Sequence, residues 1–187
     1  CKNGKYGVIN FKNEVVIPFM YDYISSVNNH TLYKGTYENK IVVEKNGKEG
    51  IINDKNEVLL PFEYGDIGFL SDETLIIRDR KKEIEYIADY SGKRICNTDF
   101  NRISVQIDSN NKYFVANLKE QGKEAVIDKY GNIVFDFKYQ NIYIFYNSDS
   151  DKFYFIVTYE NNLENILDEN GKKLLPCDYE RINIIDN

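Results

Sequence analysis

Apolar residues in this chain come in short runs that are rich in Val and Ile and are bounded by Asn, Asp and Gly. Two such runs flank a polar turn at Val8-Ile9 and 15–17, and two more at Ile51-Ile52 and 58–60. β-Branched residues fit the pleated surface of a sheet, and no stretch has the apolar spacing of an amphipathic helix. The pattern therefore predicts an all-β chain of short antiparallel strands joined by tight turns.

The polar turn recurs along the chain. Its first residue is Asn10, Asn53, Asp89, Asp128 or Asp168, so successive copies lie 43, 36, 39 and 40 residues apart. Its last residue is Asn13, Asn56, Gly92, Gly131 or Gly171. Asn and Asp side chains bond to their own backbone and start turns, while Gly and Asn tolerate positive φ. A period of this size is typical of a solenoid, a propeller or another repeat array.

Each copy also carries an aromatic residue after its second strand, namely Tyr21, Tyr64, Phe100, Tyr139 and Tyr179. Three residues earlier, three of the copies have proline, at Pro18, Pro61 and Pro176. Proline cannot donate to a strand ladder, so we expect it to end the strand. We interpret the aromatic row as packing between neighbouring copies, because repeats bury a face against each other. A stacked aromatic platform for a ligand is the alternative.

Further apolar strands lie between the motifs, for example at 40–44 and 152–159. Each full copy then has about four strands in roughly 40 residues. We expect residues 1–187 to form a single β-repeat domain, or a part of a longer chain, with five copies near 1–27, 38–70, 74–107, 112–146 and 152–185. The first copy lacks a leading strand and the last copy ends after its fourth. This favours an open or incompletely closed array of antiparallel repeats over a five-bladed propeller-like ring.

The repeated motif, Gly-x-Ile-[Asp/Asn]-x-x-[Gly/Asn]-x-Val-x-x-Pro-x-x-Tyr-[Asp]-x-Ile, resembles the bacterial WG-repeat family in degenerate copies. The family's Trp-Gly pair is replaced by Tyr6-Gly7, Glu49-Gly50, Glu85-Tyr86, Glu124-Ala125 and Glu164-Asn165, and the chain contains no Trp. The resemblance implies a bacterial β-repeat array and brings no catalytic residues with it. A binding role that depends on the Trp does not transfer to this chain.

Composition narrows the classes of partner. The net charge of −6 and the pI near 5.0 disfavour nucleic acid and anionic membrane surfaces, both of which attract basic proteins. No apolar run approaches the ~18 residues of a membrane-spanning helix. Cys96 and Cys177 fall at apolar positions, which indicates free thiols rather than a disulfide framework. Cys1 fits either the lipid-bearing cysteine of a bacterial lipoprotein or a start within a longer array.

Metal and cofactor sites are not expected. His30 is the only histidine and has no second His or paired Cys near it, so we interpret it as a loop residue. Asp149 and Asp151 lie in a polar loop that lacks the Gly and the distal Glu of a calcium loop. The chain has no Gly-rich phosphate loop and none of the common hydrolase motifs.

Two rows of carboxylates leave one catalytic alternative open. Asp89, Asp128 and Asp168 form the first row, and Glu49, Glu85, Glu124 and Glu164 form the second. Paired carboxylates can act as acid and base, so a hydrolase such as a glycosidase is the second hypothesis. We interpret the Asp row as turn chemistry and the Glu row as strand residues facing water.

The preferred hypothesis is a non-catalytic module that binds protein, glycan or further repeats of the same chain. Tyrosine is enriched at interfaces, and two tyrosine-rich runs supply the candidate binding residues Tyr143, Phe145, Tyr154 and Tyr159. We expect no cofactor, no nucleic acid and no membrane span. A bacterial surface or secreted setting is favoured over a cytoplasmic one, although the sequence leaves the compartment open.

Overall fold

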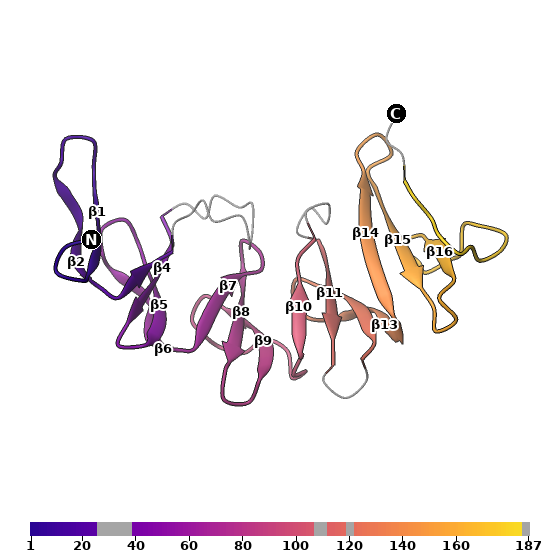
Figure 1. Cartoon of the computed structure of the whole chain (residues 1–187), viewed down its shortest axis with the longest axis horizontal. Helices are drawn as coiled ribbons and strands as arrows, with labels where there is room; N and C mark the ends of the chain where they lie inside the picture. The colour runs from indigo at the N-terminus through magenta and orange to yellow at the C-terminus, as the bar shows by residue number, and fades with distance from the viewer. Residues whose placement is uncertain (26–38, 107–111, 119–121, 185–187) are drawn as a thin grey trace. The chain divides into compact units, whose positions relative to one another are not determined.

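The computed structural model describes residues 1–25, 39–106, 112–118 and 122–184 of the chain. Over these ranges the chain forms strands, turns and bends, with no helix that could cross a membrane (Figure 1). The all-β prediction is confirmed. His30, interpreted above as a loop residue, lies outside the described residues.

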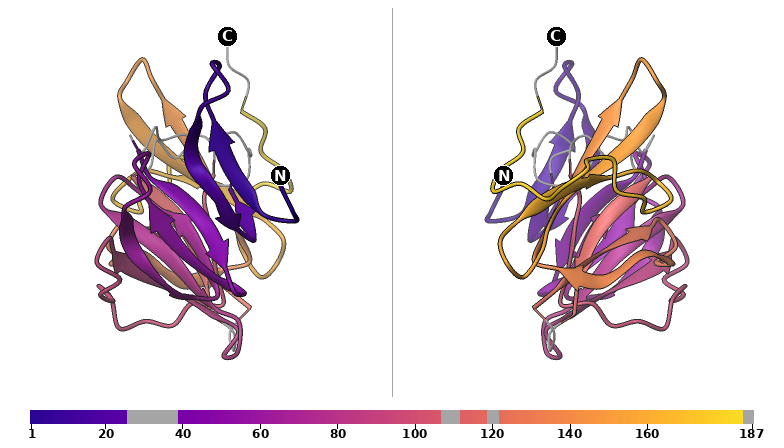
Figure 2. Two further views of the ribbon diagram at one scale, coloured as in Figure 1. Left: turned by 90° about the vertical axis from the view of Figure 1, so that its left-hand side faces the viewer. Right: turned by 90° about the vertical axis from the view of Figure 1, so that its right-hand side faces the viewer.

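The chain divides into two units, Cys1–Asn97 and Thr98–Asn187. In the first unit the strands form antiparallel sheets of two, four and three strands, in the order β1-β2, β3-β4-β5-β6 and β7-β8-β9. Their bounds are β1 Tyr6–Ile9, β2 Val15–Tyr21, β3 Tyr23–Ile24, β4 Ile41–Lys45, β5 Lys48–Ile52, β6 Val58–Tyr64, β7 Asp66–Phe69, β8 Thr74–Asp79 and β9 Ile84–Asp89. The two-stranded ribbon β1–β2 faces the viewer in the left-hand view of Figure 2.

The second unit holds a four-stranded sheet, β10-β11-β12-β13, and a three-stranded sheet, β14-β15-β16. The bounds are β10 Arg102–Ser104, β11 Tyr113–Asn117, β12 Glu124–Asp128, β13 Ile133–Tyr139, β14 Asn141–Asn147, β15 Lys152–Thr158 and β16 Glu164–Leu167. None of the sheets closes on itself. The fold is thus a series of small open antiparallel sheets, as the repeat pattern predicts.

The sheets are offset from the sequence copies by one strand. β7 begins two residues after Tyr64, yet it pairs with β8 of the next copy and not with β6. β14 follows Tyr139 and pairs with β15 in the same way. The chain therefore leaves one sheet through its aromatic residue and begins the next sheet immediately.

The predicted turn chemistry is confirmed in all five copies. In the second copy, Oδ1 of Asn53 accepts hydrogen bonds from the backbone N–H groups of Lys55 and Glu57, at 3.0 and 2.8 Å. The N–H of Asn56, at φ 64°, donates to the Asn53 carbonyl at 3.0 Å. Equivalent bonds to Oδ1 form at the other first turn residues, which are Asn10, Asp89, Asp128 and Asp168.

Pro18 and Pro61 do not end their strands, contrary to the expectation. Pro18 lies inside β2 and Pro61 inside β6. In β6 the register shifts between the pairs Glu49–Tyr64 and Ile51–Leu60, so a bulge carries the proline. A bulge on an outer strand does not need the missing N–H, and this position therefore tolerates proline.

The glycine opposite the bulge has a packing reason. A Cβ built on Gly50 would lie 2.8 Å from the Leu60 carbonyl oxygen and 3.0 Å from Cδ1 of Phe62. The bulged strand crosses Gly50 too closely for a side chain. The close crossing therefore favours glycine in this copy, whereas Ala125 holds the same position opposite the matching register shift of the fourth copy.

The third and fifth copies depart from the expected four strands, because no regular strand follows their turns. Arg94 and Lys173 there make only isolated bridges, to Ala88 and Leu167. In the other copies this position is Val15, Val58 or Ile133, each paired with an Ile in the preceding strand. Cross-strand pairs of β-branched residues stabilise a ladder, and a charged residue at this position forfeits that contribution.

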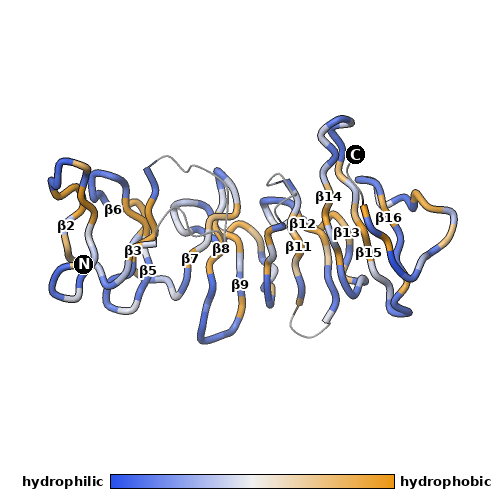
Figure 3. The backbone as a smooth tube through the Cα atoms, turned by 45° about the horizontal axis from the view of Figure 1, so that its top comes forward, coloured by the Kyte–Doolittle hydropathy of each residue, from blue (hydrophilic) through white to orange (hydrophobic). Residues whose placement is uncertain are grey.

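The hydrophobic core lies between consecutive sheets within each unit. In the first unit Ile17 and Tyr21 pack against Val43 and Ile52. A second cluster joins the sheet β3–β6 to the sheet β7–β9, and its buried residues are Val42, Ile51, Leu60, Ile67, Leu75, Ile77 and Ala88. Figure 3 shows that hydrophobic segments lie in the strands, and that the turn between β8 and β9 is hydrophilic.

Candidate functional site

Three of the four predicted binding residues share one face of the sheet β14–β15–β16. Phe145 stands directly opposite Tyr154, and Tyr143 directly opposite Ile156. Ile156 in turn pairs with Ile166 of β16. Residues that are directly opposite, or two apart on one strand, point to the same side of a sheet. These side chains therefore form one row of aromatic and aliphatic groups.

Tyr179 extends this row beyond β16. It makes an isolated antiparallel bridge to Glu164, with backbone hydrogen bonds of 2.7 and 2.9 Å in the two directions. Glu164 lies two residues before Ile166, so Tyr179 points to the same side. We call this surface the terminal face, and its residues are Tyr143, Phe145, Tyr154, Ile156, Ile166 and Tyr179.

The terminal face is accessible. The exposed fraction is 43% for Tyr143 and 41% for Tyr179. Phe145, Tyr154, Ile156 and Ile166 are half-buried. Single exposed apolar side chains are common on proteins, whereas a contiguous row such as this one is a candidate interaction surface.

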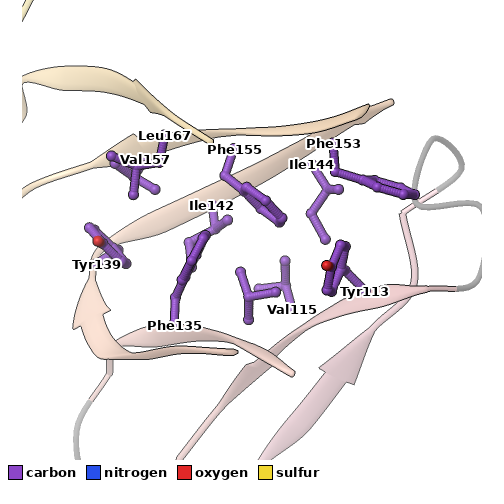
Figure 4. Close-up of a cluster of buried hydrophobic side chains, with 11 residues drawn as sticks. Tyr113, Val115, Phe135, Tyr139, Ile142, Ile144, Phe153, Phe155, Val157 and Leu167 are labelled. Carbon is purple, nitrogen blue, oxygen red and sulfur yellow. The ribbon is translucent and has the colours of Figure 1, made fainter. Parts of the chain in front are cut away.

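The opposite face of the same sheet is fully occupied by the core of the second unit. Figure 4 shows Ile142, Ile144, Phe155 and Val157 pointing toward β11 and β13. The ring of Phe155 makes edge-to-face contacts with Phe135 and Tyr113, at centroid distances of 4.7 and 5.4 Å. This packing buries one face of the sheet and fixes the sheet in place.

Tyr159, the fourth predicted residue, lies apart from the other three. It packs against the core cluster of the second unit, with its ring centroid 5.8 Å from that of Tyr139. Nζ of Lys173 lies 4.7 Å above the same ring. The structure therefore brings together Tyr143, Phe145 and Tyr154 and separates Tyr159 from them.

The aromatic residues of the repeat row occupy different environments. Tyr21, Phe100 and Tyr139 are buried, and Tyr64 is half-buried against the core of the first unit. The hydroxyl of Tyr21 donates to Oδ1 of Asn56, in the turn of the next copy, at 2.7 Å. Tyr179 alone among the five is exposed.

The Glu row does not face water, and that interpretation was wrong. Oε2 of Glu49 accepts the backbone N–H of Ile67 at 2.6 Å. Glu124 accepts the N–H of Ile142 at 2.7 Å, again eighteen residues later in the chain. Each carboxylate thus joins the strand of its own motif to the first strand of the following sheet.

Glu164 makes the same bond to the N–H of Ile182 at 2.7 Å, and Glu85 is buried and paired with Arg78. The spacing of eighteen residues between each Glu and the later Ile is visible in the sequence. Nothing in the sequence indicates that the carboxylate reaches the backbone, so sequence reasoning missed this role.

Burial perturbs the carboxylates of this row. Loss of water around Glu49 raises its pKa from 4.5 to about 7, although the Ile67 N–H acts in the opposite direction. Burial also raises the pKa of Glu124, against the effect of the Ile142 N–H. Both groups hold backbone in place, so the raised pKa values have a structural origin.

The carboxylates of the Asp row are engaged in hydrogen bonds within their own turns. In Asp128, Oδ1 accepts two backbone N–H groups and Oδ2 accepts Nδ2 of Asn132 at 2.8 Å. Within the ranges that the structure covers, no three His, Cys, Asp or Glu side chains gather as a metal site. Asp151 lies in the β14–β15 turn at φ 53° and accepts the hydroxyl of Tyr146 at 2.8 Å.

Several solved structures resemble the chain at low identity. The first is "KlHsv2 with loop 6CD replaced by a Gly-Ser linker", with 14% identity, a TM-score of 0.46 and coverage of 85% of this chain and 53% of that chain. The WD40 β-propeller domain of Doa1 has 10% identity and a TM-score of 0.34, and the match covers 86% of this chain and 55% of that chain. BamB from Moraxella catarrhalis has 10% identity and a TM-score of 0.31, and the match covers 87% of this chain and 64% of that chain. The chain thus spans about half the length of the first two. No curated protein matches it.

A family model described as "WG containing repeat" matches residues 6–29 and 50–82. The first match begins at Tyr6-Gly7 and the second at Gly50, where the family's Trp-Gly pair falls in the repeat. Both matches include the Asx turn, the bulged proline and the aromatic residue described above. The chain therefore carries repeated copies of the WG-repeat family unit.

Proposed function

We propose that this chain is a non-catalytic binding module whose terminal face contacts a protein or a glycan. The observation that carries the proposal is the continuous row of Tyr143, Phe145 and Tyr154 on one accessible sheet face, held rigid by the core behind it. Tyrosines on a rigid support offer a large contact area, and a hydroxyl for hydrogen bonding, at little cost in conformational entropy.

The cellular location of the module is part of the same proposal. In this proposal the module belongs to a bacterial surface or secreted protein, and its partner is an extracellular protein or polysaccharide. The acidic chain, with its net charge of −6, gives no support to a phosphate-rich partner.

A capture experiment tests this proposal. The immobilised chain is incubated with bacterial cell-surface protein and, separately, with a panel of polysaccharides. The double variant Tyr143→Ala/Tyr154→Ala should lower capture at least about tenfold, since buried tyrosines at interfaces contribute on the order of 1 to 2 kcal/mol each. Tyr130→Ala is the matched control, because Tyr130 is similarly exposed, at 40%, but lies on a turn of another sheet. Equal capture by all three proteins would refute the proposal.

The hydrolase hypothesis has a separate test. The double variant Asp128→Asn/Asp168→Asn removes both carboxylates while keeping the Oδ1 acceptor that the turns use, as Asn10 and Asn53 do naturally. We expect the variant to fold and to bind like the original chain. A glycosidase activity that is present in the original chain and absent from the folded variant would favour the hydrolase.

A further inference from the structure

The terminal face corresponds to a face that is covered elsewhere in the chain. In the first unit Val42 pairs with Ile51, and Glu49 pairs with Tyr64. Val42, Ile51 and Tyr64 lie in the cluster that the sheet β7–β9 completes. This side of the sheet β3–β6 is therefore buried by the next sheet.

The second unit repeats the arrangement. Val115 pairs with Val126, and Glu124 pairs with Tyr139. Val115, Val126 and Tyr139 are all buried in the cluster that the sheet β14–β16 completes. The same three repeat positions thus form the contact with the following sheet in both units.

Ile156, Ile166 and Tyr179 occupy these three positions in the sheet β14–β16. Ile156 pairs with Ile166, and Tyr179 bridges Glu164, as in the two buried cases. Here the two isoleucines are half-buried and Tyr179 is 41% exposed. Through residue 184, the described chain forms no sheet after β16.

The covering side of the contact is also recognisable in the sequence. Where two consecutive sheets lie in one unit, the residue just before the Asx turn packs onto the preceding sheet, as Ile52 does in the first unit and Leu167 in the second. Both are at most 2% exposed. Ile9 holds this position in the first copy and is 48% exposed.

The second residue of the turn makes a further contact with the preceding sheet. Nζ of Lys40 lies 4.3 Å above the ring of Tyr90. In the second unit Tyr113 holds the repeat position of Lys40, and Glu169 holds that of Tyr90. The hydroxyl of Tyr113 donates to Oε1 of Glu169 at 2.9 Å. Phe11 holds the turn position in the first copy and is fully exposed.

The last residue of the turn contacts the hydroxyl of the repeat tyrosine in the preceding sheet. The Tyr21 hydroxyl donates to Oδ1 of Asn56 at 2.7 Å. The Tyr64 hydroxyl lies so close to Gly92 that an added Cβ would be 2.0 Å from it. Asn13 holds this position in the first copy. We call Ile9, Phe11 and Asn13 the initial turn.

We propose that the terminal face of one molecule docks on the initial turn of a second copy of this chain. Tyr154 occupies the position of Lys40 and Tyr113, so it meets Phe11, while the Tyr179 hydroxyl donates to Oδ1 of Asn13. The contact reproduces between molecules the one that consecutive sheets make within each unit. It uses different surfaces on the two partners, so association continues head to tail and does not stop at a dimer. The inference rests on the proposed function, because it names the partner of the same face.

Analytical ultracentrifugation of the purified chain over a range of concentrations tests this inference. We expect the weight-average mass to rise steadily with protein concentration. For a weak contact, the rise should continue up to concentrations on the order of 1 mM. Two double variants change the same two positions. Phe11→Glu/Tyr154→Glu places like charges in the contact and should weaken association at least about tenfold. Phe11→Glu/Tyr154→Lys places opposite charges there, with lysine at the repeat position that Lys40 holds in the first unit, and should retain association.

Tyr179→Phe removes only a hydroxyl and should fold like the original chain. It therefore tests the same contact if a charged variant fails to fold. This variant should weaken association about threefold to tenfold, as the loss of one hydrogen bond implies. A chain that stays monomeric at every concentration overturns the inference, and so does equal association of the two double variants. A monomer whose capture of protein or glycan still depends on Tyr143 and Tyr154 would overturn the inference alone and leave the proposed function standing.

Discussion

Glu49 offers a direct measurement of what the buried carboxylate row does. Its carboxylate accepts the N–H of Ile67 at 2.6 Å, and burial raises its pKa from 4.5 to about 7. The substitution Glu49→Gln removes the charge and keeps an oxygen that accepts the same N–H. The difference between the two proteins therefore isolates the cost of ionising this group in the folded state.

The sign and the size of the effect follow from the two pKa values. Between pH 4.5 and about 7 the folded chain holds the proton that the unfolded chain has lost, so the free energy of unfolding falls as pH rises. At about 1.4 kcal/mol per pKa unit, the upper bound is roughly 3.5 kcal/mol. Water around the partly exposed carboxylate reduces this, and we expect about 1 to 2 kcal/mol.

Urea unfolding at pH 5, 6, 7 and 8 provides the assay. The two proteins should have similar free energies of unfolding at pH 5, and Glu49→Gln should become the more stable by about 1 to 2 kcal/mol at pH 8. Glu49→Ala is the control, because it leaves the Ile67 N–H without its acceptor and should be destabilised by about 1 to 3 kcal/mol at every pH. A difference between the original chain and Glu49→Gln that does not change with pH would refute the reasoning.

Three further substitutions test the repeat unit by urea unfolding. Gly50→Ala places a Cβ 2.8 Å from the Leu60 carbonyl and should cost about 1 to 3 kcal/mol; an unchanged midpoint would mean that the strands at Gly50 separate easily enough to accept a side chain, as they do at Ala125. Tyr21→Phe removes the hydrogen bond to Oδ1 of Asn56 and should cost about 1 kcal/mol; equal stability would show that this bond is not needed between sheets. Val58→Lys copies the charged residue of the strandless copies and should cost about 0.2 to 1 kcal/mol and speed amide exchange in β6; unaltered exchange would contradict the role given to the cross-strand pair.

Local features of the repeat were predictable because they depend on residues a few positions apart. The bonds from the Asn53 side chain to the next four residues need no other part of the chain, and all five Asx turns form as expected. The proline prediction failed for a related reason. Whether Pro61 ends a strand or sits in a bulge depends on the strand beside it, which its own neighbours in the sequence do not reveal.

The candidate surface was predictable only in part. The tyrosine-rich runs pointed to Tyr143, Phe145 and Tyr154, but alternation along a strand does not say which face meets the core. The burial of Phe155 and Val157 against β11 and β13 assigns the faces and turns Tyr159 inward. The Glu row went unrecognised because its partner is a backbone N–H eighteen residues away.

The sequence by itself determined the all-β class, the repeat period and the turns, because strand propensity and Asx chemistry act over a few residues. Tertiary structure alone decided that each sheet borrows its first strand from the preceding copy, that Glu49 and Glu124 hold that strand, and which side of β14–β16 is left exposed. These outcomes depend on which strands pair and which faces meet. Such contacts form between residues far apart in the chain, where the sequence pattern carries no record of the partner.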